Sequence, residues 1–290
     1  MNAYVSLQEL KSRGALNTTG TAADARVLNQ IVAVSREVDA YCGVHFYTQE
    51  GTKFYNGSAS TTLLIDDNVG VTSLKEDSTQ DGTYDVTWNG TGENNTTDFF
   101  LEPYNAEPSS ENHGRPYYKM TVNPNTPGSQ DIFEGGRRNY EVVGKWGYSS
   151  HTRAQAVTVS GTGTTDATAT SLAVSAAGLE VGWTIVIGTE QLFIESTGTG
   201  ANLTVRRGVN GAPSANISNS AAITYYTYPP TVTEAVLMQT SRLFRRAQGG
   251  YASEVSITDA GINQPNIPRN GLDSDVKLML GRFKKPAVIA

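Results

Sequence analysis

The sequence predicts an α+β protein in which the N- and C-terminal helices form a four-helix bundle beside a central antiparallel β region. Near both ends of the chain, apolar residues recur every three or four positions, which is the period of an amphipathic helix. In the middle, short runs of aromatic and β-branched residues alternate with Gly, Asn and Asp, as in strands joined by tight turns. A later run rich in Thr, Ala and Gly indicates a small inserted β domain.

Two helices are expected at the N-terminus. Ser6 and Glu9 fit a capping box, in which each side chain satisfies a backbone N–H at the start of a helix. Gly14 should end this helix, because glycine adopts the left-handed conformation of a helix C-terminus without strain. A second helix should start near Thr21 and end at Gly43. Its buried stripe is expected to contain Val27, Leu28, Ile31, Val34, Val38 and Tyr41.

An antiparallel β region should follow, from His45 to about residue 150. Asp66, Asp67 and Asn68 are expected to form a hairpin turn, because Asp and Asn favour turns. The segment from Glu107 to Gln130 is rich in Pro, Asn and Ser, so we expect a long loop there. The expected strands include Lys53–Tyr55, Thr62–Ile65, Tyr84–Trp88 and Glu141–Tyr148.

A second β segment interrupts the chain between about Ala156 and Tyr226. Its expected strands include Trp183–Ile187 and Leu192–Glu195. Helical periodicity returns soon afterwards, which is why the segment is interpreted as an insertion. The expected domains are therefore residues 1–153 together with 227–290, and an inserted β module over residues 154–226.

Two more helices are expected at the C-terminus. Thr231 and Glu234 fit a second capping box after Pro230, and Gly249–Gly250 should end that helix. A last helix should begin near Asp273 and lead into a basic tail.

Composition and charge exclude several classes of function. The net charge is -6 and the isoelectric point is near 5.2, so the whole chain would repel a polyanion such as nucleic acid. No apolar window is long enough for a membrane-spanning helix, and no basic and apolar leader opens the sequence. We therefore expect a soluble protein that is made in the cytoplasm.

Residue spacing argues against an enzyme, a metal site or a cofactor. His45, His113 and His151 are too far apart for a recognisable zinc motif. Cys42, the one cysteine, is expected to be a small buried residue rather than a nucleophile. The Asp66–Asn68 run lacks the ligand series of a calcium loop. Glu190 and Glu195 could form a carboxylate pair of a glycosidase, but no acid–base partner can be placed.

Three local patterns and their order carry a more specific hypothesis. Tyr4–Lys11, followed by Ser35–Gly43 and His45–Tyr47, forms the opening pattern. Thr233–Arg246 forms the second, and Leu272–Phe283 forms the closing pattern. In this order they resemble the helices of the head–tail connector (adaptor) proteins of long-tailed bacteriophages. The middle of this chain is much larger than in the short members of that family.

The inserted segment carries a resemblance of its own. Gly182–Glu190 and Leu203–Gly211 are similar to a small β module that occurs in various phage structural proteins. In that module a threonine usually follows the last glycine, whereas Ala212 follows it here. The role of the module is not implied by this similarity, and we expect an outward-facing decoration.

The connector resemblance implies a non-enzymatic ring, usually of twelve copies, at the head–tail junction of the virion. The portal protein would lie above the ring, and the next neck or tail protein, a stopper or tail terminator, would lie below. Genomic DNA would pass through the channel without sequence-specific binding. Four basic or aromatic residues of the tail would contact the portal: Arg282, Phe283, Lys284 and Lys285.

Three arginines lie on one face of the third predicted helix. Arg242, Arg245 and Arg246 could line the DNA channel, or they could pair with acidic residues of a neighbouring subunit. Subunit pairing is favoured, because a channel that lets DNA slide should not hold it tightly.

Other functions were weighed against the connector. A helix-turn-helix DNA reader is disfavoured, because Asp24, Glu37 and Asp39 leave the second helix without a basic face. A receptor- or carbohydrate-binding β-rich tail protein is the main alternative, given the Thr- and Gly-rich strands and the Tyr and Trp residues. Four capped helices favour the connector over this alternative. A hydrolase has no motif to support it.

Overall fold

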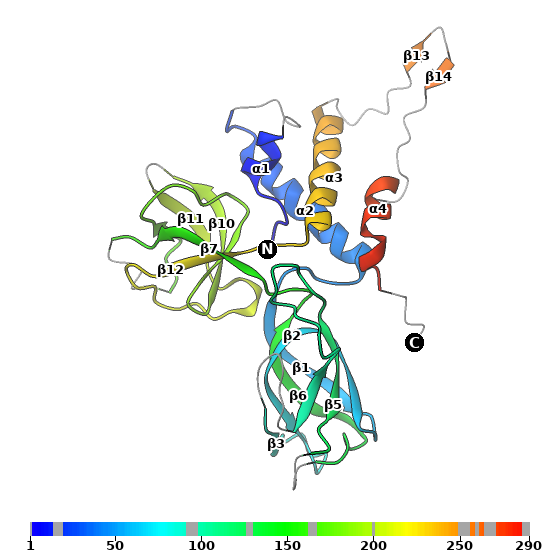
Figure 1. Cartoon of the computed structure of the whole chain (residues 1–290). Coiled ribbons are helices and arrows are strands. Elements are labelled where there is room, and N and C mark those ends of the chain that lie inside the picture. Colours follow the sequence, from blue (N-terminus) through cyan, green and yellow to red (C-terminus); the bar gives the residue numbers. More distant parts are fainter. Residues whose placement is uncertain are drawn as a thin grey trace. The chain divides into compact units, whose positions relative to one another are not determined.

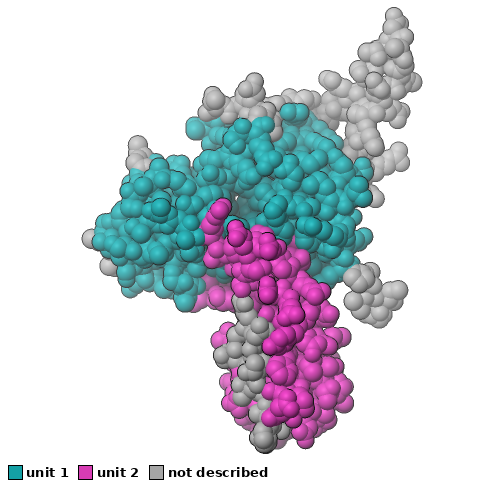
Figure 2. All heavy atoms as spheres, viewed as in Figure 1, with its two compact units in different colours: residues 1–44, 154–209, 214–290 teal, residues 45–153, 210–213 magenta. Residues whose placement is uncertain are grey.

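The computed structural model describes residues 2–13, 20–90, 98–125, 130–161, 167–198, 201–248, 256–258, 261–263 and 271–285. Its contacts divide the chain into two compact units (Figure 2). Unit 1 comprises Met1–Val44, Ala154–Val209 and Ser214–Ala290, and unit 2 comprises His45–Arg153 and Asn210–Pro213. The expected domain boundaries remain a prediction.

The chain is mainly β, so the predicted α+β fold with a four-helix bundle is wrong. Two six-stranded antiparallel sheets contain most of the regular structure that is described (Figure 1). Helices α1 (Leu7–Ser12) and α4 (Ser274–Leu280) have only 6 and 7 residues. Such helices have about two turns and offer little apolar surface for a bundle core. Only α2 (Asp24–Cys42) and α3 (Pro230–Gln248), with 19 residues each, reach bundle length in the described chain.

The N-terminal helices begin and end largely where the sequence predicts. Ser6 is the N-cap of α1, and its hydroxyl accepts a hydrogen bond from the Glu9 N–H at 2.9 Å. Gly43 ends α2 in the left-handed conformation, with φ of 69°, and its N–H donates to the Asp39 carbonyl. Gly14 lies outside the described residues. The cap at Ser6 and the stop at Gly43 therefore act where the sequence predicts, whereas α2 begins at Asp24 without a side-chain cap.

The C-terminal helices differ from the prediction in one cap. Helix α3 begins at Pro230, so the predicted capping box at Thr231 is wrong, and the Pro229 carbonyl accepts the N–H groups of Val232 and Thr233. Proline suits the first helical position because it has no N–H to leave unpaired. Asp273 precedes α4, as expected. Helix α2 contacts both α1 and α3, and α3 contacts α4. The predicted end of α3 at Gly249–Gly250 lies outside the described residues.

The second sheet, in unit 1, closes into a small barrel. Its strands follow the order β7-β12-β9-β10-β11-β8, and the two ends of that order meet at the Val159–Val174 bridge. Ser160 N–H donates to the Ala173 carbonyl, and Ser175 N–H donates to the Thr158 carbonyl. Closure removes free strand edges. The strands are β7 (Thr152–Thr158), β8 (Ser171–Ala173), β9 (Thr184–Ile187), β10 (Glu190–Thr197), β11 (Asn202–Arg206) and β12 (Ala222–Tyr226).

Unit 2 is a bent sheet around its own apolar core. The order is β1-β6-β2-β5-β4, with β3 also paired to β2. Trp88 stacks on Phe133 in the core, with ring centroids 4.7 Å apart. The strands are β1 (Gln49–Gly57), β2 (Thr62–Glu76), β3 (Val86–Trp88), β4 (Phe99–Glu102), β5 (Tyr117–Val122) and β6 (Gly136–Trp146). The remaining short elements are η1 (Val209–Gly211), β13 (Ser256–Thr258), β14 (Gly261–Asn263) and η2 (Gly281–Phe283).

Two predictions about unit 2 are wrong. The expected turn at Asp66–Asn68 lies inside β2, which pairs with β5 at Thr62–Leu64 and again at Asn68, and with β6 from Asn68 onward. The register shifts at this point, so the residues accommodate a bulge instead of a reversal. The expected loop from Glu107 to Gln130 contains strand β5.

Candidate functional site

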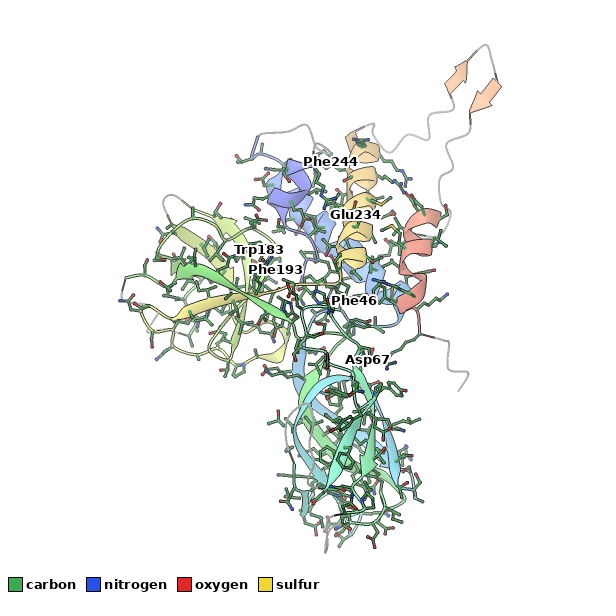
Figure 3. The ribbon with its side chains drawn as sticks, in the orientation of Figure 1. Phe46, Asp67, Trp183, Phe193, Glu234 and Phe244 are labelled. Carbon is green, nitrogen blue, oxygen red and sulfur yellow. The ribbon has the colours of Figure 1, made fainter. Side chains whose placement is uncertain are left out.

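The predicted interface residues lie on α3, on η2 and in the segment after it, all within unit 1. Helix α3 is fixed on one side by apolar contacts. Phe244 is buried, and the Arg26 guanidinium of α2 lies over its ring at 5.7 Å (Figure 3). This contact fixes the turn of α3 that carries Arg242, Arg245 and Arg246.

Arg242 has partners within its own chain. Its guanidinium donates to Asp275 through Nη1 and Nη2, at 2.7 and 2.6 Å, and to Asp273 Oδ2 at 2.9 Å. Hydrogen bonds from Arg242 lower the pKa of Asp275 to about 2, and those from Asp275 and Asp273 raise the pKa of Arg242. Arg246 Nη2 also reaches Asp273, at 3.4 Å. These contacts hold α4 against α3.

Arg245 differs from its two neighbours. Its side chain is exposed, and it forms no ion pair or side-chain hydrogen bond with any residue that the structure describes. Of the three arginines that the sequence places together, Arg245 is thus the one whose charge stays available to a partner.

The basic tail folds back on unit 1. Arg282 donates to Thr231 Oγ1 at 2.7 Å, and its guanidinium lies 4.5 Å from the centroid of the Phe283 ring. Lys284 lies over the Tyr41 ring at 5.1 Å. Phe283 is only 8% exposed, whereas Arg282, Lys284 and Lys285 are exposed. Phe283 therefore acts as an anchor for the tail inside its own chain.

The backbone fixes the tail as well. The Lys285 N–H donates to the Cys42 carbonyl at the end of α2, at 2.9 Å. Sequence reasoning missed this contact and the acidic partners of Arg242. An Asp-x-Asp pattern at the start of α4, with basic residues one turn apart on α3, was the available signal for the ion pairs. Nothing in the sequence indicated the backbone contact.

The histidines do not form a metal site in the described structure. His113 and His151 contact edge to face at 5.3 Å, and His113 Nδ1 lies 3.2 Å from Ser149 Oγ. His45 lies instead beside Tyr47. Among the described residues, no three His, Cys, Asp or Glu side chains are grouped so as to hold a metal ion. Burial, with a smaller effect of His151, lowers the pKa of His113 to about 4.

The other reactive candidates have structural roles. Cys42 is fully buried, and burial, together with the Asp39 charge, raises its pKa to about 12. Glu190 pairs with Arg207 and Glu195 pairs with Arg206 on the barrel. Both carboxylates are therefore engaged by arginines, which gives no support to a glycosidase.

The acidic run in β2 is also accounted for. Asp66 Oδ2 accepts hydrogen bonds from Lys53 Nζ at 2.8 Å and from the Tyr55 hydroxyl at 3.2 Å. A lysine beside a carboxylate competes with a bound cation. The pairing favours a cross-strand salt bridge over a calcium ligand at Asp66.

No helix in the described part of the chain combines the length and apolar character that crossing a membrane requires. Comparison with family models, curated proteins and solved structures finds no match to this chain. Its function is therefore inferred from its own residues.

Proposed function

We propose that the chain is a structural head–tail connector of a tailed bacteriophage, which forms a ring of twelve copies beneath the portal. The ring would join the DNA-filled head to the next neck or tail protein and continue the DNA channel. The order of the three sequence patterns that resemble the adaptor family is the first support for this proposal.

The second support for the proposal is structural: the basic tail is anchored on unit 1. Buried Phe283 and the Lys285–Cys42 hydrogen bond hold Arg282, Lys284 and Lys285 in place on unit 1. Because the backbone of the tail is already ordered, docking of these three positive charges would cost little backbone conformational entropy. Such a preformed surface suits docking onto an acidic face of a larger template.

Ring symmetry would strengthen such modest contacts. When copies dock side by side on a preformed template, the second and later contacts form at high effective concentration. An exposed arginine such as Arg245 could then contribute at the boundary between copies, while Arg242 and Arg246 keep α4 in place. The net charge of -6 is compatible with DNA that passes without being held.

A second candidate is a receptor- or carbohydrate-binding tail protein. The mainly β structure favours this candidate, because the predicted bundle that argued against it is not formed. On the barrel, half-buried Trp183 and Tyr225 also stack on each other, with ring centroids 4.0 Å apart. One experiment must therefore separate assembly from adsorption.

The decisive experiment is electron microscopy of the particles made when the gene is disrupted in its phage. Filled heads and tails that accumulate separately would support the connector. Complete tailed particles that fail only to adsorb to cells would overturn it and support the receptor-binding candidate.

Variants can test the tail itself. Deletion of residues 282–290 is a poor test, because it removes buried Phe283. The triple variant Arg282→Gln, Lys284→Gln, Lys285→Gln keeps Phe283 and should abolish joining of heads and tails. A control variant with Arg137→Gln, Lys145→Gln and Arg153→Gln removes the same charge from unit 2. Equal loss of joining in both variants would contradict a specific role of the tail.

A further inference from the structure

A cavity of about 440 Å³ lies within unit 1, between the N-terminal segment and residues of the barrel. Residues Ala3–Ser6 and the first turn of α1 form one wall. Trp183, which Figure 3 labels, and the segment Tyr225–Tyr228 form the other. Its size is in the range of sites that enclose a small ligand or a side chain.

Aromatic rings line the barrel side of the cavity. Tyr225 pairs with Ile185 across β12 and β9, so its side chain shares a face with Trp183, two positions before Ile185. The two rings are nearly parallel, with an interplanar angle of 7°. Tyr228 packs on Tyr4 nearby, with centroids 4.5 Å apart. The half-buried rings of Trp183 and Tyr225 therefore provide the aromatic surface of the cavity, whereas Tyr4 is almost completely buried.

Two carboxylates line the same cavity. The Ser6 hydroxyl donates to the Glu180 carboxylate and accepts the backbone N–H of Glu9, so Ser6 links Glu180 to the first turn of α1, which carries Glu9. Glu234 is close enough to act on Glu9. Burial raises the pKa of Glu9, and the charges of Glu180 and Glu234 raise it further, although Arg13 opposes them.

The cationic side chains near this cavity already have partners. The Arg36 guanidinium lies over the Tyr4 ring at 5.2 Å and pairs with Asp39 at 3.2 Å. Arg13 pairs mainly with Glu234, at 2.7 Å, and lies 3.5 Å from Glu9. Among the described residues that line the cavity, none is a lysine or an arginine. A partly desolvated carboxylate with like charges beside it is stabilised when a cation binds.

We propose that this cavity binds an arginine side chain presented by a partner protein. A guanidinium group is planar, so it stacks on aromatic rings, and its N–H groups pair with carboxylates in fixed geometry. Aromatic rings and carboxylates both line this cavity. A saccharide would also stack on Trp183, but it carries no positive charge to pair with Glu9 and Glu180. This inference does not depend on the proposed assembly role.

A matched pair of peptides tests the proposal on the full-length chain. The probes are a blocked Gly-Arg-Gly peptide and the same peptide with citrulline, which keeps the shape of arginine without its charge. Binding is followed by NMR at the indole N–H of Trp183, which is assigned by its loss in Trp183→Phe. The chain's other tryptophans, Trp88 and Trp146, belong to unit 2 and report on unspecific change.

The arginine peptide should shift the Trp183 signal with a Kd of about 1 mM, and citrulline should bind about tenfold more weakly. Glu9→Gln and Glu180→Gln should each weaken arginine binding about tenfold. Glu195→Gln, on the same barrel but paired with Arg206, should leave it unchanged.

Three outcomes would overturn the proposal. The first is equal binding of the arginine and citrulline peptides. The second is arginine binding that Glu9→Gln and Glu180→Gln do not weaken. The third is a Trp183 shift with a neutral oligosaccharide and none with the arginine peptide, which would make this a saccharide site.

Discussion

Glu190 and Arg207 form a bidentate ion pair that is almost completely buried, with side chains 1% and 6% exposed. Arg207 Nε donates to Oε1 at 2.7 Å and Nη2 donates to Oε2 at 2.6 Å. The N–H groups of Gly208 and Ala215 donate to the same carboxylate, each at 3.1 Å. Burial alone would raise the pKa of Glu190, but these hydrogen bonds lower it. One carboxylate thus fastens the segment after β11 to the start of β10.

Replacing Arg207 should destabilise the barrel strongly. Arg207→Met leaves the Glu190 carboxylate buried without its cation, which should lower the free energy of unfolding by about 3–5 kcal/mol. The adjacent variant Arg206→Met breaks the exposed pair with Glu195 and should cost less than about 1 kcal/mol. Urea denaturation of both variants measures the difference. Similar losses would show that the buried pair has no special role.

His113 should make unit 2 sensitive to acid. Its pKa is about 4 in the folded chain and about 6.5 when exposed, so the unfolded chain binds a proton first as the pH falls. The stabilisation is complete above pH 6.5 and is lost progressively as the pH falls towards 4. Between pH 7.5 and pH 5 the loss should be about 2 kcal/mol.

The variant His113→Asn isolates this effect. Its unfolding free energy should fall less between the two pH values than that of the wild type, in a Trp183→Phe background where Trp88 and Trp146 report unfolding. Exposed His45→Asn is the control and should behave as the wild type. An identical pH dependence of His113→Asn and the wild type would exclude the buried histidine as the cause.

Gly43 should be intolerant of a side chain. Its φ of 69° is left-handed, so Gly43→Ala should cost roughly 1–2 kcal/mol even though the added Cβ would meet only Lys285 at 3.7 Å. Gly20→Ala, in the same unit, has no atom within 4 Å of its Cβ and should change stability by less than about 0.5 kcal/mol. Thermal unfolding of the two variants shows whether backbone strain, rather than steric room for the added Cβ, sets the cost.

Replacing Arg242 should affect stability, whereas replacing Arg245 should affect assembly. Arg242→Gln loses its pairs with Asp273 and Asp275, which are partly exposed, so it should cost about 1 kcal/mol of stability. Arg245→Gln should leave stability unchanged and reduce the joining of heads and tails. Denaturation and microscopy of particles test the two parts. Normal assembly with Arg245→Gln would remove this residue from the proposed interface.

Cys42 should be inert in the folded chain. Its thiol is buried and its pKa of about 12 leaves almost no thiolate at pH 8. A chromogenic disulfide reagent should therefore react with it only after urea unfolds the chain. Reaction of the native protein at the rate of a free thiol would contradict this burial.

Two features that depend on neighbouring residues were predicted correctly from the sequence, although the capping box at Thr231 was not. The cap at Ser6 and the stop at Gly43 need only a side chain and the adjoining helix, so their positions are encoded locally. The predicted bundle failed because helix length and the spread of strands over the chain decide the fold class. The apolar periodicity at the two ends of the chain indicates neither how long the helices are nor how many strands lie between them.

Features that depend on distant residues were missed. The run Asp66–Asn68 has the composition of a turn, yet it lies inside β2, where the register against β5 shifts and pairing with β6 begins. Arg242 finds Asp275 at a separation of 33 residues, and Glu190 finds Arg207 at 17. For Glu190 and Arg207, no local pattern distinguishes the pair from ordinary surface charges before the strands are placed.

The closed barrel has a consequence for how a gene could acquire it. Its first and last strands, β7 and β12, are neighbours in the sheet, so the chain enters and leaves the barrel about one strand spacing apart, about 4.8 Å. A single recombination event could therefore add or delete the whole segment, and a short turn would rejoin the ends.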